Sequence, residues 1–510
     1  MMRGLILMHL KPHASRLITI ALIACSLQTA VARPASKAPA PLEASLQQKK
    51  ESAVGQGLAG NWFGVLEAGG AKLRLLLKIK VGADGSLQAS LDSLDQGAMD
   101  LRVDSIVQTG PIIRAELKAI GAVLEGKLNS EGTEIAGSWK QGGGELPLTL
   151  KHVTEVPAPR RPQEPQKPYP YTEEEVVYEN KRDKVKLAAT LTIPRGQGPV
   201  PAVVLITGSG PEDRNEAVYG HRPFLVLADY LTRRGIAVLR ADDRGVGGSS
   251  APGPSDTSEN YAMDALSGVE FLKTRKEINP RQIGLIGHSE GGLIAPLAAV
   301  RSTDVAFIVL IAGPGIPGEQ LLDLQAMLIL KAQGAPDVLA EDNRRLQQLM
   351  ISILKAEKTD AAAESRLRAE LPRVMAEIPE ERRKALGITE EMLLRQFKTM
   401  TNAWFRNFVT YDPRPVLKQV RCPVLAVIGS LDLQVPARQN LPAITEALKA
   451  GGNKDYTVLE LAGLNHLLQT ARTGSPVEYA QTEETMSPKA LELIAGWIIK
   501  HTTQQPMSAK

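Results

Sequence analysis

Cysteine is nearly absent from this chain, which has 510 residues but only Cys25 and Cys422. Cys25 lies in an N-terminal leader, so a mature chain cut after Ala32 keeps one cysteine and can form no internal disulfide. The sequence also lacks a Cys/His cluster and a His-Glu-x-x-His pattern, so it implies no metal ion. Gly245-Val246-Gly247-Gly248 lacks the full G-x-G-x-x-G spacing, and no nucleotide or other cofactor is implied.

Charge of one sign is not in excess either. The formal net charge is +4, and Arg3, Lys11 and Arg16 in the leader carry three of these charges, which leaves +1 from residue 33 onward. A near-neutral chain gives no reason to expect nucleic acid or an anionic surface as partner. Outside the leader no apolar run reaches the ~20 residues that a membrane span needs. The length, with 43% hydrophobic and 23% charged residues, is typical of a globular protein with two or three domains.

Residues 1–32 have the pattern of a signal peptide. Basic residues precede an apolar run from Leu17 to Ala24, and Ala30-Val31-Ala32 offers a small-x-small cleavage site. A second interpretation stays open, because Leu22-Ile23-Ala24-Cys25 is similar to a bacterial lipoprotein box in which Cys25 is acylated. Both interpretations predict export: to the bacterial periplasm or the medium in the first case, and to a lipid-anchored position at the cell envelope in the second.

The amino-acid composition differs between two segments that follow the leader. Residues 33–55, rich in Ala, Pro, Lys and Gln, predict a flexible tether, and residues 56–153 predict a small antiparallel β domain, either a barrel or a sandwich. In the β domain, short apolar runs alternate with turns marked by glycine. Gly60-Asn61-Trp62 and Gly137-Ser138-Trp139 are similar to each other near its two ends. For these tryptophans, packing in the core is favoured over a platform for a ligand.

Residues 154–170 contain six prolines and predict an extended, semi-rigid linker. From 171 to 505, short apolar and β-branched runs alternate with helical stretches, which predicts an α/β fold with a mostly parallel sheet covered on both faces. The alternation stops at about 316–412, where no strand candidate occurs and apolar residues repeat at helical spacing. We expect this stretch to be a helical cap inserted over the strand ends.

The most informative motif is Gly287-His288-Ser289-Glu290-Gly291. It follows the apolar run from Ile283 to Ile286 and opens a helix-forming run, which is the strand–turn–helix context of a nucleophile elbow. The two glycines allow the sharp turn that exposes the hydroxyl of Ser289. Because a serine hydroxyl is a weak nucleophile, it needs a base and an acid that orients the base.

Asp432 and His466 meet that need by their positions. Asp432 follows the strand candidate Val424 to Ile428, and His466 follows Thr457 to Leu461. In open α/β sheets, functional groups gather at the carboxyl ends of strands. The order Ser, Asp, His is that of α/β hydrolases, and among seven histidines only His466 combines this order with a loop after a strand. We therefore predict Ser289 as nucleophile, His466 as general base and Asp432 as the residue that orients it.

Two backbone N–H groups are candidates for an oxyanion hole. One belongs to Glu290, directly after the nucleophile, and its side chain is expected either to contact substrate or to be solvated. The other should come from the loop Thr207-Gly208-Ser209-Gly210, with Ser209 as the expected donor. In the predicted cap, an aromatic cluster provides candidates for a substrate pocket, with packing inside the cap as an equal alternative. Its members are Trp404, Phe405, Phe408 and Tyr411.

Four segments together resemble the α/β-hydrolase superfamily: Leu205 to Pro211, Ala241 to Gly247, Gly287 to Gly292, and Gly463 to His466. More closely, the chain is similar to EstD-like exported bacterial serine carboxylesterases that carry an N-terminal β domain. The resemblance covers about residues 171–500 and implies hydrolysis of short-chain acyl esters by the predicted triad. Such enzymes often have His before the glycine of the oxyanion loop. Thr207 stands there in this chain, which leaves open how the loop is held.

The sequence thus predicts an exported serine hydrolase that cleaves a small-molecule ester through an acyl-enzyme. A serine peptidase, or an aminoacyl or peptidyl hydrolase, would use the same triad and remains an alternative. A non-catalytic binding protein on a hydrolase scaffold is a third interpretation, although an intact triad argues against it.

Overall fold

The computed structural model describes residues 58–503, except 69–70, 83, 95–97, 142–143, 156–159 and 197. The predicted signal peptide, Cys25 and the predicted tether lie outside the described residues. The described chain divides into two compact units, one made of residues 58–155 and 375–389 and the other of residues 160–374 and 390–503. In the part of the chain that is described, no helix has the length and apolar character required to cross a membrane.

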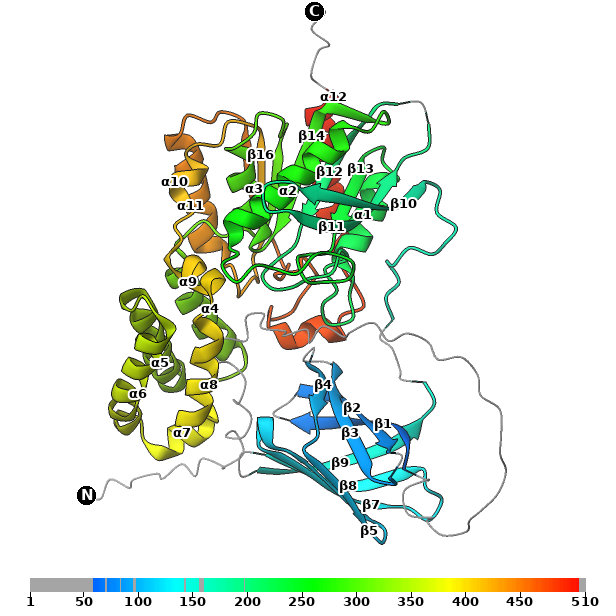
Figure 1. Cartoon of the computed structure of the whole chain (residues 1–510), viewed down its shortest axis with the longest axis vertical. Helices are drawn as coiled ribbons and strands as arrows, with labels where there is room; N and C mark the ends of the chain where they lie inside the picture. Colours follow the sequence, from blue (N-terminus) through cyan, green and yellow to red (C-terminus); the bar gives the residue numbers. More distant parts are fainter. Residues whose placement is uncertain are drawn as a thin grey trace, which may run out of the picture. The chain divides into compact units, whose positions relative to one another are not determined.

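The N-terminal unit is built on a nine-stranded antiparallel sheet, coloured blue to cyan in Figure 1. Its strands are β1 (Gly60–Ala68), β2 (Ala71–Val81), β3 (Leu87–Ser93), β4 (Ala98–Arg102), β5 (Ser105–Thr109), β6 (Ile112–Leu117), β7 (Ala122–Leu128), β8 (Glu134–Gln141) and β9 (Gly144–Val153). The order across the sheet is β4-β3-β2-β1-β9-β8-β7-β6-β5. The predicted antiparallel sheet is therefore present.

This sheet closes on itself. Strands β4 and β5 stand at opposite ends of the strand order, yet only Val103 and Asp104 separate them in the chain. The N–H of Val103 bonds to Ala89 O of β3 at 3.3 Å, and the N–H of Asp104 bonds to Glu116 O of β6 at 2.8 Å. One continuous segment thus joins both edges, and of the two predicted architectures the structure adopts the barrel.

The interior of the barrel is filled by apolar side chains. Leu73, Leu75, Leu77 and Ile79 alternate along β2 and all join one buried cluster, as the two-residue period of a strand requires. Trp62 and Trp139 belong to the same cluster and are 0% and 4% exposed. Both tryptophans are core residues, in line with the interpretation favoured from the sequence.

The second unit contains an eight-stranded sheet in the order β10-β11-β13-β12-β14-β15-β16-β17 (Figure 1). Its strands are β10 (Thr172–Asn180), β11 (Val185–Ile193), β12 (Val200–Ile206), β13 (Ala237–Ala241), β14 (Ile278–His288), β15 (Ile308–Ile311), β16 (Val424–Gly429) and β17 (Tyr456–Leu461). Strand β11 pairs antiparallel with β10 and β13, and all other pairs are parallel. The predicted, mostly parallel sheet is confirmed.

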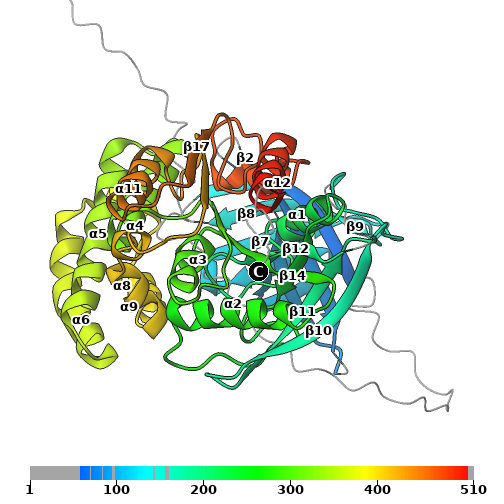
Figure 2. The same cartoon turned by 90° about the horizontal axis from the view of Figure 1, so that it is seen from above.

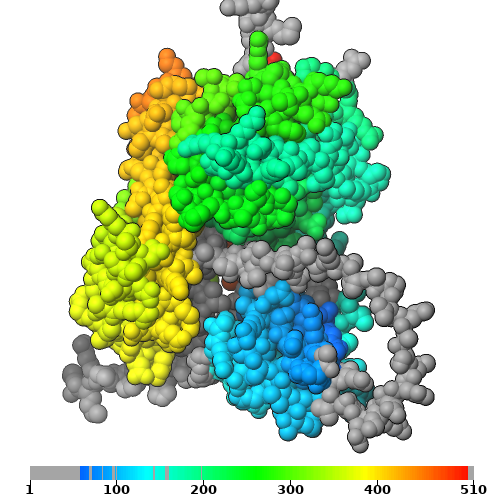
Figure 3. All heavy atoms as spheres, viewed as in Figure 1, coloured from blue at the N-terminus to red at the C-terminus, as the bar shows by residue number. Residues whose placement is uncertain are grey.

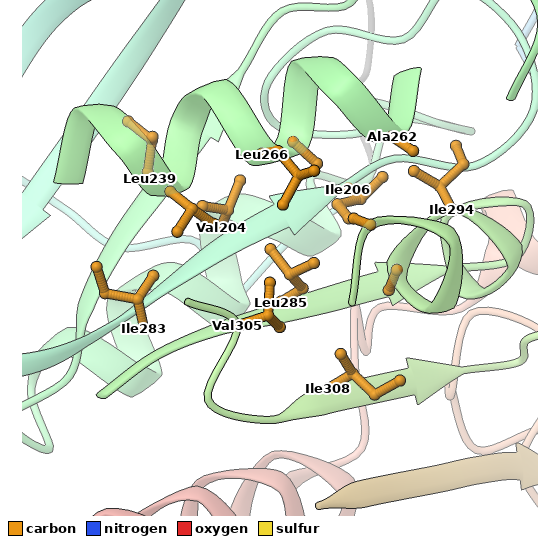
Figure 4. Packing of buried hydrophobic residues seen from close by; sticks show 14 of the residues in the cluster. Val204, Ile206, Leu239, Ala262, Leu266, Ile283, Leu285, Ile294, Val305 and Ile308 are labelled. Carbon is orange, nitrogen blue, oxygen red and sulfur yellow. The ribbon is translucent and has the colours of Figure 1, made fainter. Parts of the chain in front are cut away.

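Helices cover both faces of this sheet (Figure 2). Helices α2 (Ser258–Lys273), α3 (Gly291–Ala299), α10 (Arg414–Leu417) and α11 (Ala437–Ala450) lie on one face, and α1 (Pro223–Thr232) and α12 (Pro488–Thr503) on the other. Alternate residues of β12 point to opposite faces of the sheet. Val204 and Ile206 pack in the cluster with α2 and α3, whereas Val203 and Leu205 pack in the cluster with α1 and α12. Figure 4 shows the α2–α3 side, where Ala262, Leu266 and Ile294 lie over the strands. Because both faces are buried, these strands consist of nearly continuous apolar runs.

Before α10, six more helices lie between β15 and β16. They are α4 (Gly318–Ala332), α5 (Asp337–Ala356), α6 (Asp360–Glu377), α7 (Glu380–Leu386), α8 (Glu390–Met400) and α9 (Ala403–Thr410). All residues from 312 to 423 are described and none of them is in a strand, as predicted for 316–412. Figure 3 shows the outer surface of this insertion in yellow-green to gold.

The predicted linker is bound to the second unit over much of its length. Pro157 and Pro159 lie outside the described residues, but Arg161 donates to the carbonyl oxygens of Ala480 at 3.1 Å and Thr482 at 2.8 Å. Gln163 accepts from the N–H of Thr485 at 2.6 Å. From Arg160 onward the segment is therefore part of a folded domain and not a free spacer, because its polar side chains satisfy backbone groups of that domain.

Candidate active site

Ser289 lies at the turn between β14 and α3. Its φ is +53°, a left-handed conformation that is uncommon for a residue with a Cβ. The flanking glycines make this turn possible: a Cβ on Gly287 would lie 1.9 Å from Gly291 O, and a Cβ on Gly291 would lie 2.2 Å from Ile206 O. The geometry is that of the nucleophile elbow predicted from the sequence.

Asp432 and His466 are hydrogen-bonded to each other. Nδ1 of His466 lies 2.9 Å from Oδ2 of Asp432, and the two residues are 4% and 3% exposed. They follow β16 and β17, neighbouring parallel strands that end at the same edge of the sheet. Oδ1 of Asp432 accepts from the N–H groups of Gln434 at 2.9 Å and Val435 at 2.8 Å. The carboxylate is therefore fixed, and its bond to Nδ1 leaves Nε2 of His466 as the atom able to accept a proton.

The elbow and the His466 loop are in direct contact through His288. The rings of His288 and His466 have centroids 4.8 Å apart, and Nε2 of His288 lies 3.0 Å from the backbone oxygen of His466. Among the described residues, no hydrogen bond joins the Ser289 hydroxyl to the His466 ring. In enzymes without bound substrate such catalytic hydrogen bonds are often long and tighten only in the complex.

The loop after β12 lies against the elbow. A Cβ on Gly208 would be 3.4 Å from the Cβ of Ser289, which is an ordinary van der Waals distance, so the loop and the elbow are neighbours. Within the described part of the chain, no acceptor is bonded to the N–H of Ser209 or to that of Glu290, the two predicted oxyanion donors.

Two carboxylates hold this loop. The Thr207 hydroxyl donates to Asp243 at 2.8 Å, and the Gly208 N–H donates to Oε1 of Glu216 at 2.9 Å. Asp243 also accepts from the N–H of Glu212 at 2.9 Å, and burial raises the pKa of Asp243 to about 8. Thr207, which stands where related enzymes often have His, therefore anchors the loop through Asp243.

The Glu290 side chain is buried, so the expectation that it is solvated was wrong. It is 2% exposed, and its carboxyl group accepts from the Ser258 hydroxyl at 2.6 Å and from Nε1 of Trp404 at 2.7 Å. The nearby Ser209 side chain lowers the pKa of this carboxyl group, but burial outweighs it and raises the pKa of Glu290. Glu290 thus links the elbow to the oxyanion loop, to α2 and to the helical insertion.

Of the four aromatic pocket candidates, the structure brings Trp404 to the elbow. Its indole is bonded to Glu290 and stacks on Phe408 with ring centroids 5.7 Å apart. Phe405 and Phe408 are buried on α9 at 3% and 7% exposure. Tyr411 packs against the core cluster that contains α2 and α3. Trp404 is therefore the member of the set in direct contact with a residue next to Ser289.

The comparison with known proteins agrees with this geometry. A family model described as serine aminopeptidase, S33, matches residues 222–470. Esterase EstD of Thermotoga maritima is 28% identical over 315 residues, which is 62% of this chain and 66% of EstD, slightly under two thirds of that esterase. By these matches the chain resembles the α/β hydrolases. The resemblance to EstD found in the sequence is confirmed.

Solved structures match a similar part of this chain. The Pyrococcus furiosus esterase Pf2001 has a TM-score of 0.40 and 16% identity, covering 68% of this chain and 98% of Pf2001. Est1E of Butyrivibrio proteoclasticus, solved with ferulic acid bound, has a TM-score of 0.35 and 18% identity, covering 65% and 98%. Both TM-scores are below 0.5, so the resemblance rests on the sequence matches, the strand order and the elbow.

Two residues of this candidate site were missed from the sequence: Glu216 and the inward-facing His288. Nδ1 of His288 lies 2.8 Å from Oε1 of Glu216, and the residues are 7% and 3% exposed. Burial lowers the pKa of His288, but the Glu216 carboxylate outweighs it and raises this pKa to about 9. The position of His288 inside the elbow was the available signal, whereas no motif marks Glu216. Within the described ranges, no group of three or more His, Cys, Asp or Glu is arranged to hold a metal ion.

Proposed function

We propose that this α/β hydrolase is an exported serine carboxylesterase that cleaves short-chain acyl esters through an acyl-enzyme. The observation that carries the proposal is the buried His466–Asp432 pair at 2.9 Å, on a loop bonded to the elbow whose Ser289 has a φ of +53°. A side chain in such a strained, turn-exposed position is typical of a nucleophile. The substrate is a small-molecule ester, and no cofactor is required.

In the proposed mechanism, His466 takes the proton from Ser289 as its Oγ attacks the ester carbonyl. The tetrahedral adduct collapses to the acyl-enzyme while His466 returns that proton to the leaving alcohol. Water then attacks the acyl-enzyme with His466 again as base, which releases the acid. Asp432 stabilises the imidazolium that forms in each half-reaction, because its carboxylate is already bonded to Nδ1.

The negative charge on the adduct needs preorganised donors. We assign this role to the N–H groups of Glu290 and Ser209. The Gly208 N–H of the same loop is bonded to Glu216, and so it is not available to substrate without breaking that bond. Loss of one such donor typically costs about 3–4 kcal/mol of the barrier.

A serine aminopeptidase is the second candidate, because the matching family model carries that description. Recognition of a free amino terminus requires a carboxylate close to the nucleophile. The nearest one along the chain, Glu290, already accepts from Ser258 and Trp404, which favours an ester without an ammonium group. A panel of p-nitrophenyl acyl esters and aminoacyl p-nitroanilides measured on the same preparation separates the two: higher kcat/KM on the anilides would replace esterase by aminopeptidase.

Export is proposed from the leader sequence alone. Mass spectrometry of the mature N-terminus distinguishes its two forms: an N-terminus at residue 33 identifies a cleaved signal peptide, and a diacylglyceryl group on Cys25 identifies a lipid anchor. A chain that retains Met1 in the cytoplasm would contradict both. We also propose that the helices between β15 and β16 act as a cap over the site, which the bond from Trp404 to Glu290 supports.

The decisive variant is Ser289→Ala, which removes only the hydroxyl. We expect hydrolysis of p-nitrophenyl acetate and butyrate to fall to the uncatalysed background, and a fluorophosphonate probe to label the parent protein but not the variant. Ser302→Ala, in the loop before β15, is the matched control and should retain full activity. Turnover in Ser289→Ala equal to the parent would refute the nucleophile, and a folded parent protein that takes up no probe would favour a non-catalytic binder.

A further inference from the structure

His288 is placed inside the nucleophile elbow, but its side chain serves other segments of the chain. Nδ1 lies 2.8 Å from Oε1 of Glu216, and Nε2 lies 3.0 Å from the backbone oxygen of His466. Both His288 and Glu216 are buried. The reaction proposed above uses neither side chain, so their arrangement calls for a separate explanation.

Both partners of the His288 ring are acceptors. A backbone carbonyl oxygen carries no proton, and Oε1 of Glu216 already accepts the Gly208 N–H at 2.9 Å. A neutral imidazole has only one N–H, so it can satisfy only one of the two acceptors. With Glu216 as a carboxylate acceptor, both bonds form together when His288 is an imidazolium. The pKa of His288, raised by Glu216 to about 9, agrees with this assignment. The other titratable groups that act on the ring are Asp432 and Glu212, and burial raises the pKa of Glu212 to about 8.

The pair lies where three functional segments meet. A Cβ built on Gly208 would lie 3.4 Å from the Cβ of Ser289, 3.5 Å from Oε1 of Glu216 and 3.8 Å from Nδ1 of His288. The oxyanion loop after β12, the elbow after β14 and the His466 loop after β17 are thus joined through one ion pair. Glu216 itself has a φ of +52°, which is unfavourable for a residue with a side chain. Strain of this kind persists where surrounding contacts fix the residue in place.

We propose that the His288–Glu216 ion pair is a positioning element of this hydrolase, which holds the backbone of His466 and the oxyanion loop in fixed relation to Ser289. The proposal rests on the esterase function proposed above. The pair does not relay protons, because both N–H groups of His288 are committed to acceptors that do not take part in the reaction. Its contribution is geometric: a shift of about 1 Å between reacting groups can reduce a rate about 100-fold.

The test is Glu216→Gln, which keeps the size of the side chain and removes its charge. We expect kcat for p-nitrophenyl acetate to fall about 10- to 100-fold, with KM changed less than about twofold, because the displaced groups act in the transition state. The active form is the one with protonated His288. This form is complete below the pKa of His288 and lost above it, so the alkaline limb of kcat should move to lower pH in Glu216→Gln.

The chain offers a matched control in a second His–carboxylate pair. Nε2 of His501 lies 3.2 Å from Oδ1 of Asp455, at the start of β17 and the end of α12, away from the strand ends that carry the site. Asp455→Asn makes the same kind of charge change and should leave kcat, KM and the pH profile as in the parent protein. A purely structural role of Glu216 would lower the melting temperature of Glu216→Gln without moving the alkaline limb, and that result would overturn the proposal.

A measurement independent of turnover separates this proposal from the esterase assignment. In a protein labelled with ¹⁵N-histidine, the His288 ring should give two protonated nitrogens at pH 7.5. His288→Gln identifies the signals. A neutral His288 at that pH overturns the positioning pair even if the hydrolase is an active esterase. A charged His288 in a protein that hydrolyses no ester would instead refute the esterase function and keep the ion pair.

Discussion

Asp432 uses its two carboxylate oxygens for different partners. Oδ2 is bonded to Nδ1 of His466 at 2.9 Å, and Oδ1 accepts the N–H groups of Gln434 and Val435. In Asp432→Asn the amide oxygen can keep the backbone bonds, so the amide NH₂ faces Nδ1 and favours the tautomer protonated at Nε2. We expect kcat to fall about 10,000-fold with little change in KM, measured on p-nitrophenyl butyrate. A loss below tenfold would show that Asp432 does not orient the base.

Arg244 stabilises the fold and takes no part in the proposed reaction. Its buried guanidinium is bonded to Asp183, Asp256 and Asp264 at 2.7, 2.9 and 2.7 Å. Removal of this cation leaves buried carboxylates without a counter-charge, so Arg244→Met should lower the free energy of unfolding by about 3–5 kcal/mol, measured by urea denaturation. Arg344→Met, which breaks the more exposed pair with Asp323, is the control and should leave the urea midpoint almost unchanged.

The candidate nucleophile, base and acid could be selected from the sequence because each follows a strand that is recognisable by its apolar run. The contacts that hold them could not. Glu216 is 72 residues from His288 in the chain and lies in a loop without hydrophobic periodicity, so no pattern connects them. The buried state of the Glu290 side chain was missed for the same reason: its partners Ser258 and Trp404 are 32 and 114 residues away.

At the scale of elements, α9 connects the insertion to the elbow. Trp404 and Phe408 are one helical turn apart, stack on each other, and Trp404 is bonded to Glu290. If these rings form the wall of the acyl pocket, Trp404→Ala and Phe408→Ala enlarge it. We expect the ratio of kcat/KM for p-nitrophenyl octanoate over acetate to rise at least about tenfold, since each buried methylene contributes about 1 kcal/mol.

Two further variants distinguish a role of Trp404 in lining the acyl pocket from its hydrogen bond to Glu290. Trp404→Phe keeps an aromatic ring but removes the N–H that bonds Glu290, and it should change the chain-length ratio less than Trp404→Ala does. Phe405 is a buried residue of α9, so Phe405→Leu should lower stability without changing the ratio of kcat/KM for octanoate over acetate. An unaltered preference in folded Trp404→Ala and Phe408→Ala would assign these residues to packing within the insertion.

Strands and helices could be predicted from the sequence where a short stretch of residues carries the pattern. The runs of β12, β14 and β16 are short and apolar because both faces of the sheet are covered, and helical spacing identified the insertion. The closure of the N-terminal sheet was not predictable, since it depends on the two residues Val103 and Asp104 bonding to strands on opposite edges. Pairing between distant segments leaves no periodic trace in the sequence.

At the scale of the whole molecule, the barrel and the hydrolase domain have separate cores. The buried cluster of the barrel draws only on residues 58–150, whereas the two clusters beside the eight-stranded sheet draw only on residues 176–499. A domain with its own core can in principle fold alone. The boundary between the two is marked by Arg161 and Gln163, because both bond to the hydrolase domain and neither belongs to the barrel core.

Two truncations test where the hydrolase domain begins. A chain that starts at residue 160 keeps Arg161 and Gln163 and should hydrolyse p-nitrophenyl acetate with kcat/KM within about threefold of the full chain, because the site is built from one domain.

A chain that starts at residue 170 loses the bonds to Ala480, Thr482 and Thr485. The segment that contains these three residues continues to Ser487. The N–H of Ser487 bonds to the backbone oxygen of Leu468 at 2.8 Å, and Leu468 lies two residues after His466. The shorter chain should therefore lose most of its activity before it loses its secondary structure, measured by circular dichroism. Equal activity of the two truncations would show that this segment does not support the His466 loop, and an inactive but folded chain from residue 160 would show that the barrel contributes to catalysis.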